Sequence, residues 1–156
     1  MSGDKFMQRA LALATEKMND NNGGPFGAVI VRNGEIIAEG WNRVTSANDP
    51  TGHAEISAIR DACKKLGTFN LPDCDIYTSC EPCPMCLAAI YWARIGKIFY
   101  ANTRRNAAAI GFDDDSIYRE VSRPLSRRKI PMQQLLRHDA LKVFAEWRNK
   151  PDKIRY

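Results

Sequence analysis

Hydrophobic positions recur with two different periods along the chain, and these periods predict separate helices and strands. Apolar residues repeat at helical spacing near the start, and the Asn- and Gly-rich run 19–25 ends this first helix. Asn33-Gly34 separates two β-rich runs, which predicts a tight hairpin. The predicted helices cover residues 4–19, 53–66, 82–93, 116–120, 132–137 and 141–148. The predicted strands cover residues 26–31, 35–41, 75–79 and 97–101.

The order of these elements predicts an α/β domain. A hairpin followed by alternating helices and strands favours a sheet with helices on its faces. The chain has 156 residues, of which 44% are hydrophobic and 26% are charged. This composition suits a substantial core and argues against disorder. No repeat, low-complexity tract or clear linker interrupts the sequence, so we expect a single domain over residues 1–156.

Charge and cysteine content limit the compartments and the partners that we expect for this protein. The net charge of +5 permits contact with anionic polymers, but the basic residues are scattered, which is typical of a solvated surface. No apolar run approaches the ~20 residues needed to cross a membrane, and the N-terminus lacks a signal-peptide pattern. Three of the five cysteines are close together in the sequence, which suits metal binding in a reducing compartment. We therefore expect a cytoplasmic protein without a nucleic-acid or membrane partner.

Two short motifs, each at a predicted helix start, indicate a zinc site. The first is His53-Ala54-Glu55, and the second is PCPMC, which contains Cys83 and Cys86. Cysteines three positions apart share one face of a helix, and the free N–H groups of a helix start stabilise their thiolates. His53, Cys83 and Cys86 thus offer one nitrogen and two sulfurs to a tetrahedral zinc ion.

The fourth zinc ligand decides between a catalytic and a structural site. Cys80 precedes Cys83 by three residues and would close the site, which would make the protein a zinc-stabilised binding module without chemistry. A redox CxxC is a further alternative, but it leaves His53 and Glu55 without a role. An open site would instead bind water and lower its pKa. Two thiolates cancel the formal charge of the ion, so water then needs a neighbouring proton acceptor, and Glu55 is the candidate general acid and base.

These residues also carry a family resemblance. The segments HAEISAIR and TSCEPCPMCLAAIYWARI resemble the cytidine-deaminase-like zinc hydrolases, whose signature is H-x-E followed by P-C-x-x-C. Narrower matches resemble the bacterial guanine deaminases and extend the likeness over essentially the whole chain. They are GGPFGAVIV, the asparagine of GWNRV, NDPTGHAE, GFDDDSIY and the closing aromatic residue.

The resemblance implies a three-layer α/β/α fold with a central five-stranded mixed sheet. It also implies a homodimer in which the C-terminal segment, from about residue 120, is exchanged between subunits. The implied reaction is hydrolysis of guanine, a small purine base, to xanthine and ammonia, with one zinc ion per subunit and Glu55 as the proton shuttle. The residues implied to contact the base are Phe26, Asn42, Trp92, Asp114 and Tyr156.

Some features stay open at this point. Spacing from Gly111 favours Asp114 as the contact, but Asp113 and Asp115 flank it directly. The basic stretch 123–129 matches no known motif, and other aminopurines or triazines stay open as substrates. A tRNA adenosine or nucleoside deaminase would use the same zinc and the same glutamate. The acidic run near the expected pocket counts against a polynucleotide, because it would repel a phosphate backbone.

Overall fold

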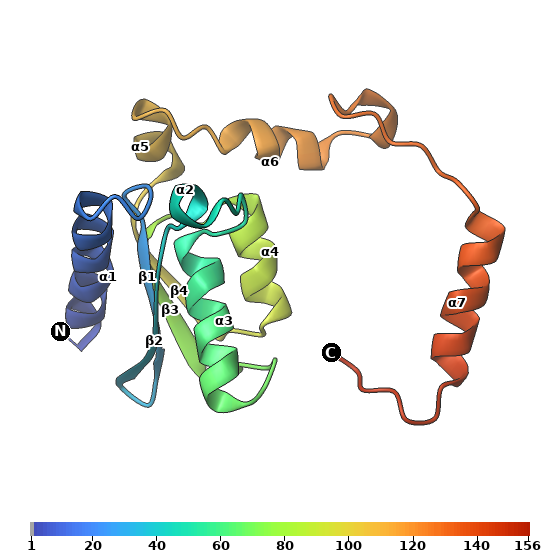
Figure 1. Cartoon of the computed structure of the whole chain (residues 1–156), viewed down its shortest axis with the longest axis horizontal. Helices are drawn as coiled ribbons and strands as arrows, with labels where there is room; N and C mark the ends of the chain where they lie inside the picture. The colour runs from blue at the N-terminus through green and yellow to red at the C-terminus, as the bar shows by residue number, and fades with distance from the viewer. Residues whose placement is uncertain (1) are drawn as a thin grey trace. The chain divides into compact units, whose positions relative to one another are not determined.

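The computed structural model describes residues 2–156, which divide into a larger unit up to Asp115 and a smaller unit, Ser116–Tyr156 (Figure 1). The larger unit contains α1 (Ser2–Asn19), β1 (Gly27–Arg32), β2 (Glu35–Trp41), α2 (Val44–Ala47), α3 (Ala54–Leu66), β3 (Cys74–Cys80), α4 (Pro84–Trp92), β4 (Lys97–Asn102) and α5 (Arg104–Ala109). α6 (Asp115–Ser122) begins at the boundary. The smaller unit continues with the 3-10 turn η1 (Leu125–Arg127) and α7 (Arg137–Asn149).

The sheet has four strands in the described residues, in the order β2-β1-β3-β4. β1 runs antiparallel to β2 and β3, and β3 runs parallel to β4, so the sheet is mixed as expected. The expectation of a fifth strand is wrong here. After β4, Thr103 and Asn106 form a reciprocal capping box that starts α5, and the alanines that follow favour a helix over a strand.

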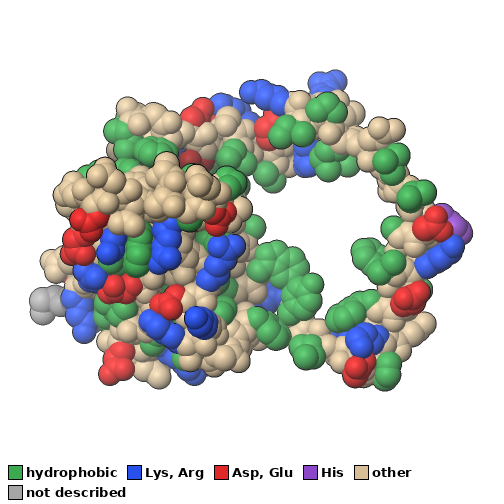
Figure 2. Space-filling view, viewed as in Figure 1, with side chains coloured by type: hydrophobic (Ala, Val, Ile, Leu, Met, Phe, Trp, Pro, Cys, Tyr) green, Lys and Arg blue, Asp and Glu red, His purple; other side chains and the backbone are tan. Residues whose placement is uncertain are grey.

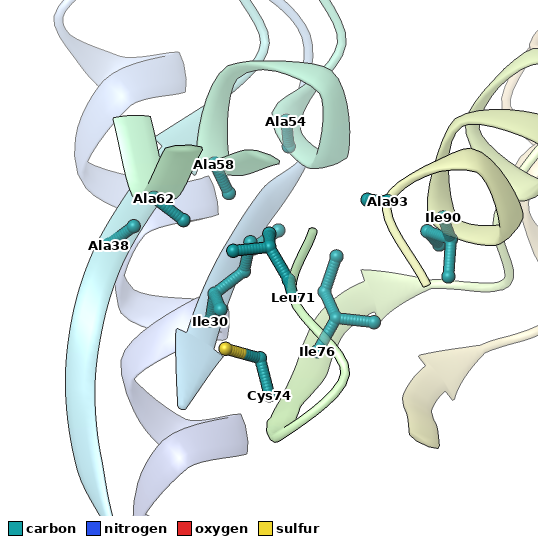
Figure 3. Close-up of a cluster of buried hydrophobic side chains, with 11 residues drawn as sticks. Ile30, Ala38, Ala54, Ala58, Ala62, Leu71, Cys74, Ile76, Ile90 and Ala93 are labelled. Atoms are coloured by element: carbon teal, nitrogen blue, oxygen red, sulfur yellow. The ribbon is translucent and has the colours of Figure 1, made fainter. Parts of the chain in front are cut away.

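Helices cover both faces of this sheet, which confirms the three-layer α/β/α arrangement (Figure 1). On one face, Val29 and Val31 of β1 pack with Phe6 and Leu13 of α1. On the other face, Ile30 packs among residues of α3 and α4. Figure 3 shows Ile30 and Ile76 from the strands beside Ala58 and Ile90 from these helices. Successive residues of β1 therefore belong to two different cores, one on each face of the sheet.

Glycines let the helices lie close to the sheet. A Cβ atom at Gly40 of β2 would overlap the Ala54 carbonyl oxygen, at the start of α3. A Cβ atom at Gly27 of β1 would overlap the Ala10 carbonyl oxygen of α1. Both neighbours are backbone atoms that cannot turn aside, so only glycine fits at either position. The first turn of α3 is thus held directly against the sheet.

Helix prediction succeeds where end signals are clear and fails where they are weak. The helix predicted at 53–66 is confirmed as α3, whose C-cap Gly67 has a φ of 63°. The helix predicted at 132–137 is wrong, because this stretch is irregular and α7 begins only at Arg137. The residue before α7, Leu136, has a φ of 49°, a conformation that ends any helix reaching it.

The smaller unit has little packing of its own. None of its described residues is buried, and Figure 2 shows hydrophobic side chains on the surface of α7, where Phe144 is 71% exposed. Part of the basic stretch has a structural partner, because the Glu120 carboxylate accepts hydrogen bonds from the Arg123 side chain and the Lys129 backbone N–H. Among residues 2–156, no helix is both long and apolar enough to cross a membrane.

Candidate metal centre and substrate cavity

Two helix starts bring the predicted zinc ligands together. His53 is the N-cap residue of α3, Cys83 is the N-cap residue of α4, and Cys86 lies in the first turn of α4. The Cys83 and Cys86 sulfurs lie 3.6 and 3.4 Å from His53 Nδ1. The three potential ligand atoms all lie within 4.8 Å of one another.

This geometry fits zinc. Zinc–sulfur bonds of ~2.3 Å and zinc–nitrogen bonds of ~2.0–2.1 Å at tetrahedral angles separate sulfur from nitrogen by about 3.5 Å, which the two observed separations match. In the described part of the chain the cluster consists of these three residues, and Cys80 is not a member. The Cys80 thiol instead lies 3.7 Å from the Thr103 carbonyl oxygen, and burial raises its pKa to about 11. The donor set is therefore one nitrogen and two sulfurs.

The two ligand cysteines differ in their affinity for a proton. Hydrogen bonds from the Cys86 thiol and from His53 lower the pKa of Cys83 to about 4. The same bond to Cys83, together with burial, raises the pKa of Cys86, and the bond to Cys83 raises the pKa of His53. Cys83 is thus a thiolate at neutral pH, and a metal ion has to displace the Cys86 proton to gain its second sulfur.

Glu55 lies beside this cluster in a cavity of about 720 Å³, a size typical of small-molecule sites. Its side chain is buried, and this burial raises the pKa of the carboxyl group. Oε1 accepts a hydrogen bond of 3.0 Å from the Thr78 hydroxyl. The glutamate therefore shares the cavity wall with His53 and Cys83 without belonging to the ligand cluster.

Three of the five predicted base contacts, Phe26, Asn42 and Asp114, line the same cavity. The Asn42 side-chain oxygen accepts hydrogen bonds of 3.2 Å from the backbone N–H groups of Gly24 and Val44. The oxygen is thus engaged by the protein, which leaves the amide nitrogen as the group for a ligand. Asp114 is the member of the acidic run that reaches the cavity, and burial raises its pKa.

The other two predicted contacts are not brought to this cavity. Trp92 ends α4, is 62% exposed and does not line the cavity. The Arg94 guanidinium lies 5.9 Å from the centre of its ring. Tyr156 closes the smaller unit and is 75% exposed.

The cavity also contains residues that sequence reasoning missed. The Phe112 ring meets the Phe26 ring edge-on at 4.9 Å and lines the same wall. In the sequence, the signal that Phe112 belongs to the cavity was its position directly before the acidic run 113–115. Glu81 also lines the cavity, and its carboxylate accepts the Arg104 backbone N–H at 2.9 Å. Thr78, the hydrogen-bond partner of Glu55, does not line the cavity, and its signal was a hydroxyl on the same face of β3 as Cys74 and Ile76.

The chain is similar to known deaminases in both sequence and structure. The zinc-binding region of the cytidine and deoxycytidylate deaminases matches residues 1–102. A guanine deaminase from Bacillus subtilis (strain 168) is 54% identical over 156 residues, which are 100% of both chains. The X-ray structure of guanine deaminase from Bacillus subtilis superposes with a TM-score of 0.97, covering 100% of this chain and 99% of that one at 54% identity.

A more distant relative differs in substrate. A tRNA-specific adenosine deaminase from Agrobacterium fabrum (strain C58) is 46% identical over 95 residues, which are 61% of this chain and 62% of that protein. The likeness to the guanine deaminase extends over the whole chain, whereas the likeness to this tRNA enzyme does not. The resemblance deduced from the motifs is therefore confirmed.

Proposed function

The chain belongs to the guanine deaminases of the cytidine and deoxycytidylate deaminase family, and from this premise we propose how its residues divide the reaction. The enzyme hydrolyses guanine to xanthine and ammonia. Water adds at C2, the carbon that bears the amino group, and the carbon–nitrogen bond to this group breaks. Protons have to move from the water to the ring and to the departing amine.

His53, Cys83 and Cys86 hold one zinc ion in this proposal. The observation that carries it is the pair of sulfur–nitrogen separations, 3.6 and 3.4 Å, which suit tetrahedral coordination. When bound, zinc supplies Lewis-acid activation of water. Cys83 contributes a thiolate at neutral pH, and the start of α4 stabilises that charge.

Glu55 is the proton shuttle in this proposal. Its carboxylate takes one proton from the attacking water and passes it to ring N3, then takes the remaining proton of the hydroxyl group formed at C2 and delivers it to the departing amine. The buried position beside the ligand cluster supports the proposal, because burial raises the pKa of this carboxyl group and makes its carboxylate a stronger proton acceptor.

Asn42 and Asp114 recognise the base by complementary hydrogen bonds. Since the Asn42 oxygen is engaged by backbone N–H groups, its amide nitrogen donates to O6 of guanine. An ionised Asp114 accepts from N1–H of the base. Phe26 and Phe112 form an aromatic wall beside it. Adenine lacks both the O6 acceptor and the N1–H donor, so this pair disfavours adenine.

We further propose a homodimer that exchanges its C-terminal segments, from about residue 120. The smaller unit has no buried residue in its described part, so its apolar side chains gain a core only against another surface. In the exchanged dimer, Tyr156 contacts the base in the active site of the partner subunit. In this proposal residues 1–156 form one deaminase domain completed by the exchange. The reduced thiols suit the cytoplasm.

The shuttle is tested by replacing Glu55 with Gln. We expect Glu55→Gln to retain one zinc ion per subunit, measured by plasma mass spectrometry, and to lose xanthine formation by about 10²- to 10⁴-fold. Glu35→Gln, which changes an exposed glutamate at the start of β2, is the matched control and should keep full activity. Full turnover by the Glu55→Gln enzyme would refute the shuttle.

Substrate choice is tested by ammonia release from guanine, guanosine, cytidine and tRNA under the same conditions. We expect release from guanine. The acidic residues Asp113–Asp115 disfavour a phosphate backbone near the cavity. If ammonia is released faster from tRNA than from guanine, the substrate is a polynucleotide and the proposal of guanine is wrong.

A further inference from the structure

Thr78 interrupts an apolar face of β3. Cys74 and Ile76 belong to the core packed against α3 and α4 (Figure 3), and Thr78 follows them on the same side of the strand. It is 1% exposed. A valine of nearly the same shape would fill this space without a polar atom. A buried hydroxyl requires a hydrogen-bond partner, and here it lies on a different element.

That partner is the proposed shuttle. Thr78 Oγ1 lies 3.0 Å from Glu55 Oε1, and both side chains are buried. The glutamate also interacts with its own backbone N–H and with the Cys86 thiol. Thr78 holds this carboxylate from β3, a strand that contributes none of the three candidate metal ligands.

We propose that Thr78 is a positioning residue for proton transfer, whose hydroxyl fixes one oxygen of Glu55 so that the other stays directed at the reacting atoms. The inference rests on the proposed shuttle. One carboxylate has to reach water, ring nitrogen and leaving amine in turn, and each transfer depends on alignment within a few tenths of an ångström. Thr78 does not line the cavity, so it acts on turnover rather than on substrate binding.

Three substitutions separate this role from a purely structural one. Thr78→Val removes the hydroxyl and keeps the shape, whereas Thr78→Ser keeps the hydroxyl. Ser79→Ala is the matched control, because Ser79 is equally buried but its hydroxyl oxygen accepts from the Gly27 N–H at 3.0 Å. A hydrogen bond to a charged group contributes enough that its loss lowers kcat by about ten- to hundredfold. We expect this loss in Thr78→Val with KM within about twofold, kcat restored to near wild type in Thr78→Ser, and little change in Ser79→Ala.

Zinc content and thermal unfolding are measured on every variant. If Thr78→Val does not fold, Thr78→Ala removes the same hydroxyl with less bulk and takes its place. Unchanged kcat without the hydroxyl, failure of Thr78→Ser to restore it, or an equal loss in Ser79→Ala would each overturn the inference. Adding Thr78→Val to Glu55→Gln should lower the residual rate by less than twofold, because the residue acts through the carboxylate. An inactive wild-type enzyme would count against the proposed function instead.

Discussion

Asn42 links two loops by hydrogen bonds and also lines the cavity. Its side-chain oxygen accepts from Gly24 and Val44, which lie on opposite sides of β1 and β2 in the sequence. A Cβ atom at Gly23 would overlap the Asn42 carbonyl oxygen, so only glycine permits this contact. One side chain therefore links two loops with its oxygen and leaves its amide nitrogen for a ligand in the cavity.

Because the oxygen and the nitrogen of the Asn42 side chain have different roles, two substitutions at this position should have different effects. Asn42→Asp keeps an acceptor for both backbone N–H groups, so we expect the thermal midpoint to fall by only a few degrees. Its carboxylate would face O6 with no donor, so KM for guanine should rise more than tenfold. Asn42→Leu also leaves both N–H groups unsatisfied, which costs about 1–3 kcal/mol for each group. Calorimetry and steady-state kinetics measure the two effects, and equal KM values for wild type and Asn42→Asp would contradict the donor role.

Sequence reasoning found the residues that local motifs encode and missed those defined by distant contacts. His53, Cys83 and Cys86 were predicted from spacing at helix starts, and the structure brings them together. The bond between Thr78 and Glu55 joins residues 23 positions apart on a strand and a helix. Such a pairing depends on how the two elements pack, which no short pattern contains.

At the scale of elements, the starts of α3 and α4 carry the candidate metal ligands. His53 and Cys83 are N-cap residues in extended conformation, with φ values of −72° and −66°. α3 is fixed by its contact with Gly40 of β2, where an added Cβ atom would overlap the Ala54 carbonyl oxygen. The candidate ligand His53 is therefore positioned by the packing of a helix backbone on a strand.

Gly40→Ala should consequently weaken both the fold and zinc binding. An added methyl group at this contact has to push the first turn of α3 away, so we expect a loss of about 2 kcal/mol or more in unfolding free energy. Competition with a chromophoric chelator should show weaker zinc binding. Gly34→Ala is the control: its φ of 79° makes alanine strained, but no atom lies within 4 Å of the added Cβ. It should cost about 1 kcal/mol and leave zinc affinity unchanged, so equal zinc loss in both variants would contradict the prediction.

The ion pair between α1 and β2 predicts a pH-dependent contribution to stability. Arg9 Nε lies 2.7 Å from Glu39 Oε1, and this hydrogen bond lowers the pKa of Glu39. A carboxyl group with a lowered pKa stabilises the fold above its unfolded pKa, and this stability is lost as pH falls through the folded value. Since both side chains are about one third exposed, we expect a contribution of about 0.5–1 kcal/mol. Urea unfolding should separate Glu39→Gln from wild type at pH 7, and the difference should disappear as the pH falls below the lowered pKa of Glu39.

The elements themselves were largely predictable, because their ends carry strong local signals. Asn33-Gly34 marks the hairpin and Gly67 the end of α3, and both glycines adopt the positive φ that such positions require. The hydrophobic pattern predicted all four strands of the sheet, whereas the fifth strand was implied only by the family resemblance. α5 was not predicted, although the capping box at Thr103 is a local signal for the start of a helix.

At the scale of the whole molecule, the two units differ in how their apolar residues are covered. The larger unit has two cores, one on each face of its sheet. The described part of the smaller unit has no buried residue, although its helices carry apolar side chains such as Leu141, Phe144 and Trp147. We expect that only assembly with a second copy supplies the missing cover.

Complementation between two inactive chains tests this assembly. One chain carries Glu55→Gln with an intact C-terminus, and the other keeps Glu55 but lacks residues 150–156. If Tyr156 serves the cavity of the partner, coexpression yields mixed dimers in which one of the two sites has both groups. We expect the doubly tagged dimer to recover roughly half of the wild-type activity. Mixed dimers as inactive as either parent would exclude exchange of the C-terminus, and light scattering establishes that the dimers form.

The position of the boundary at Asp115 has a consequence for biosynthesis. All four residues of the proposed catalytic centre, from His53 to Cys86, precede this boundary. Domains generally fold as units during translation, with the N-terminal one first. The larger unit, which contains the proposed metal site, is therefore expected to fold before the smaller unit is covered, and we expect subunit pairing to be the final step of maturation.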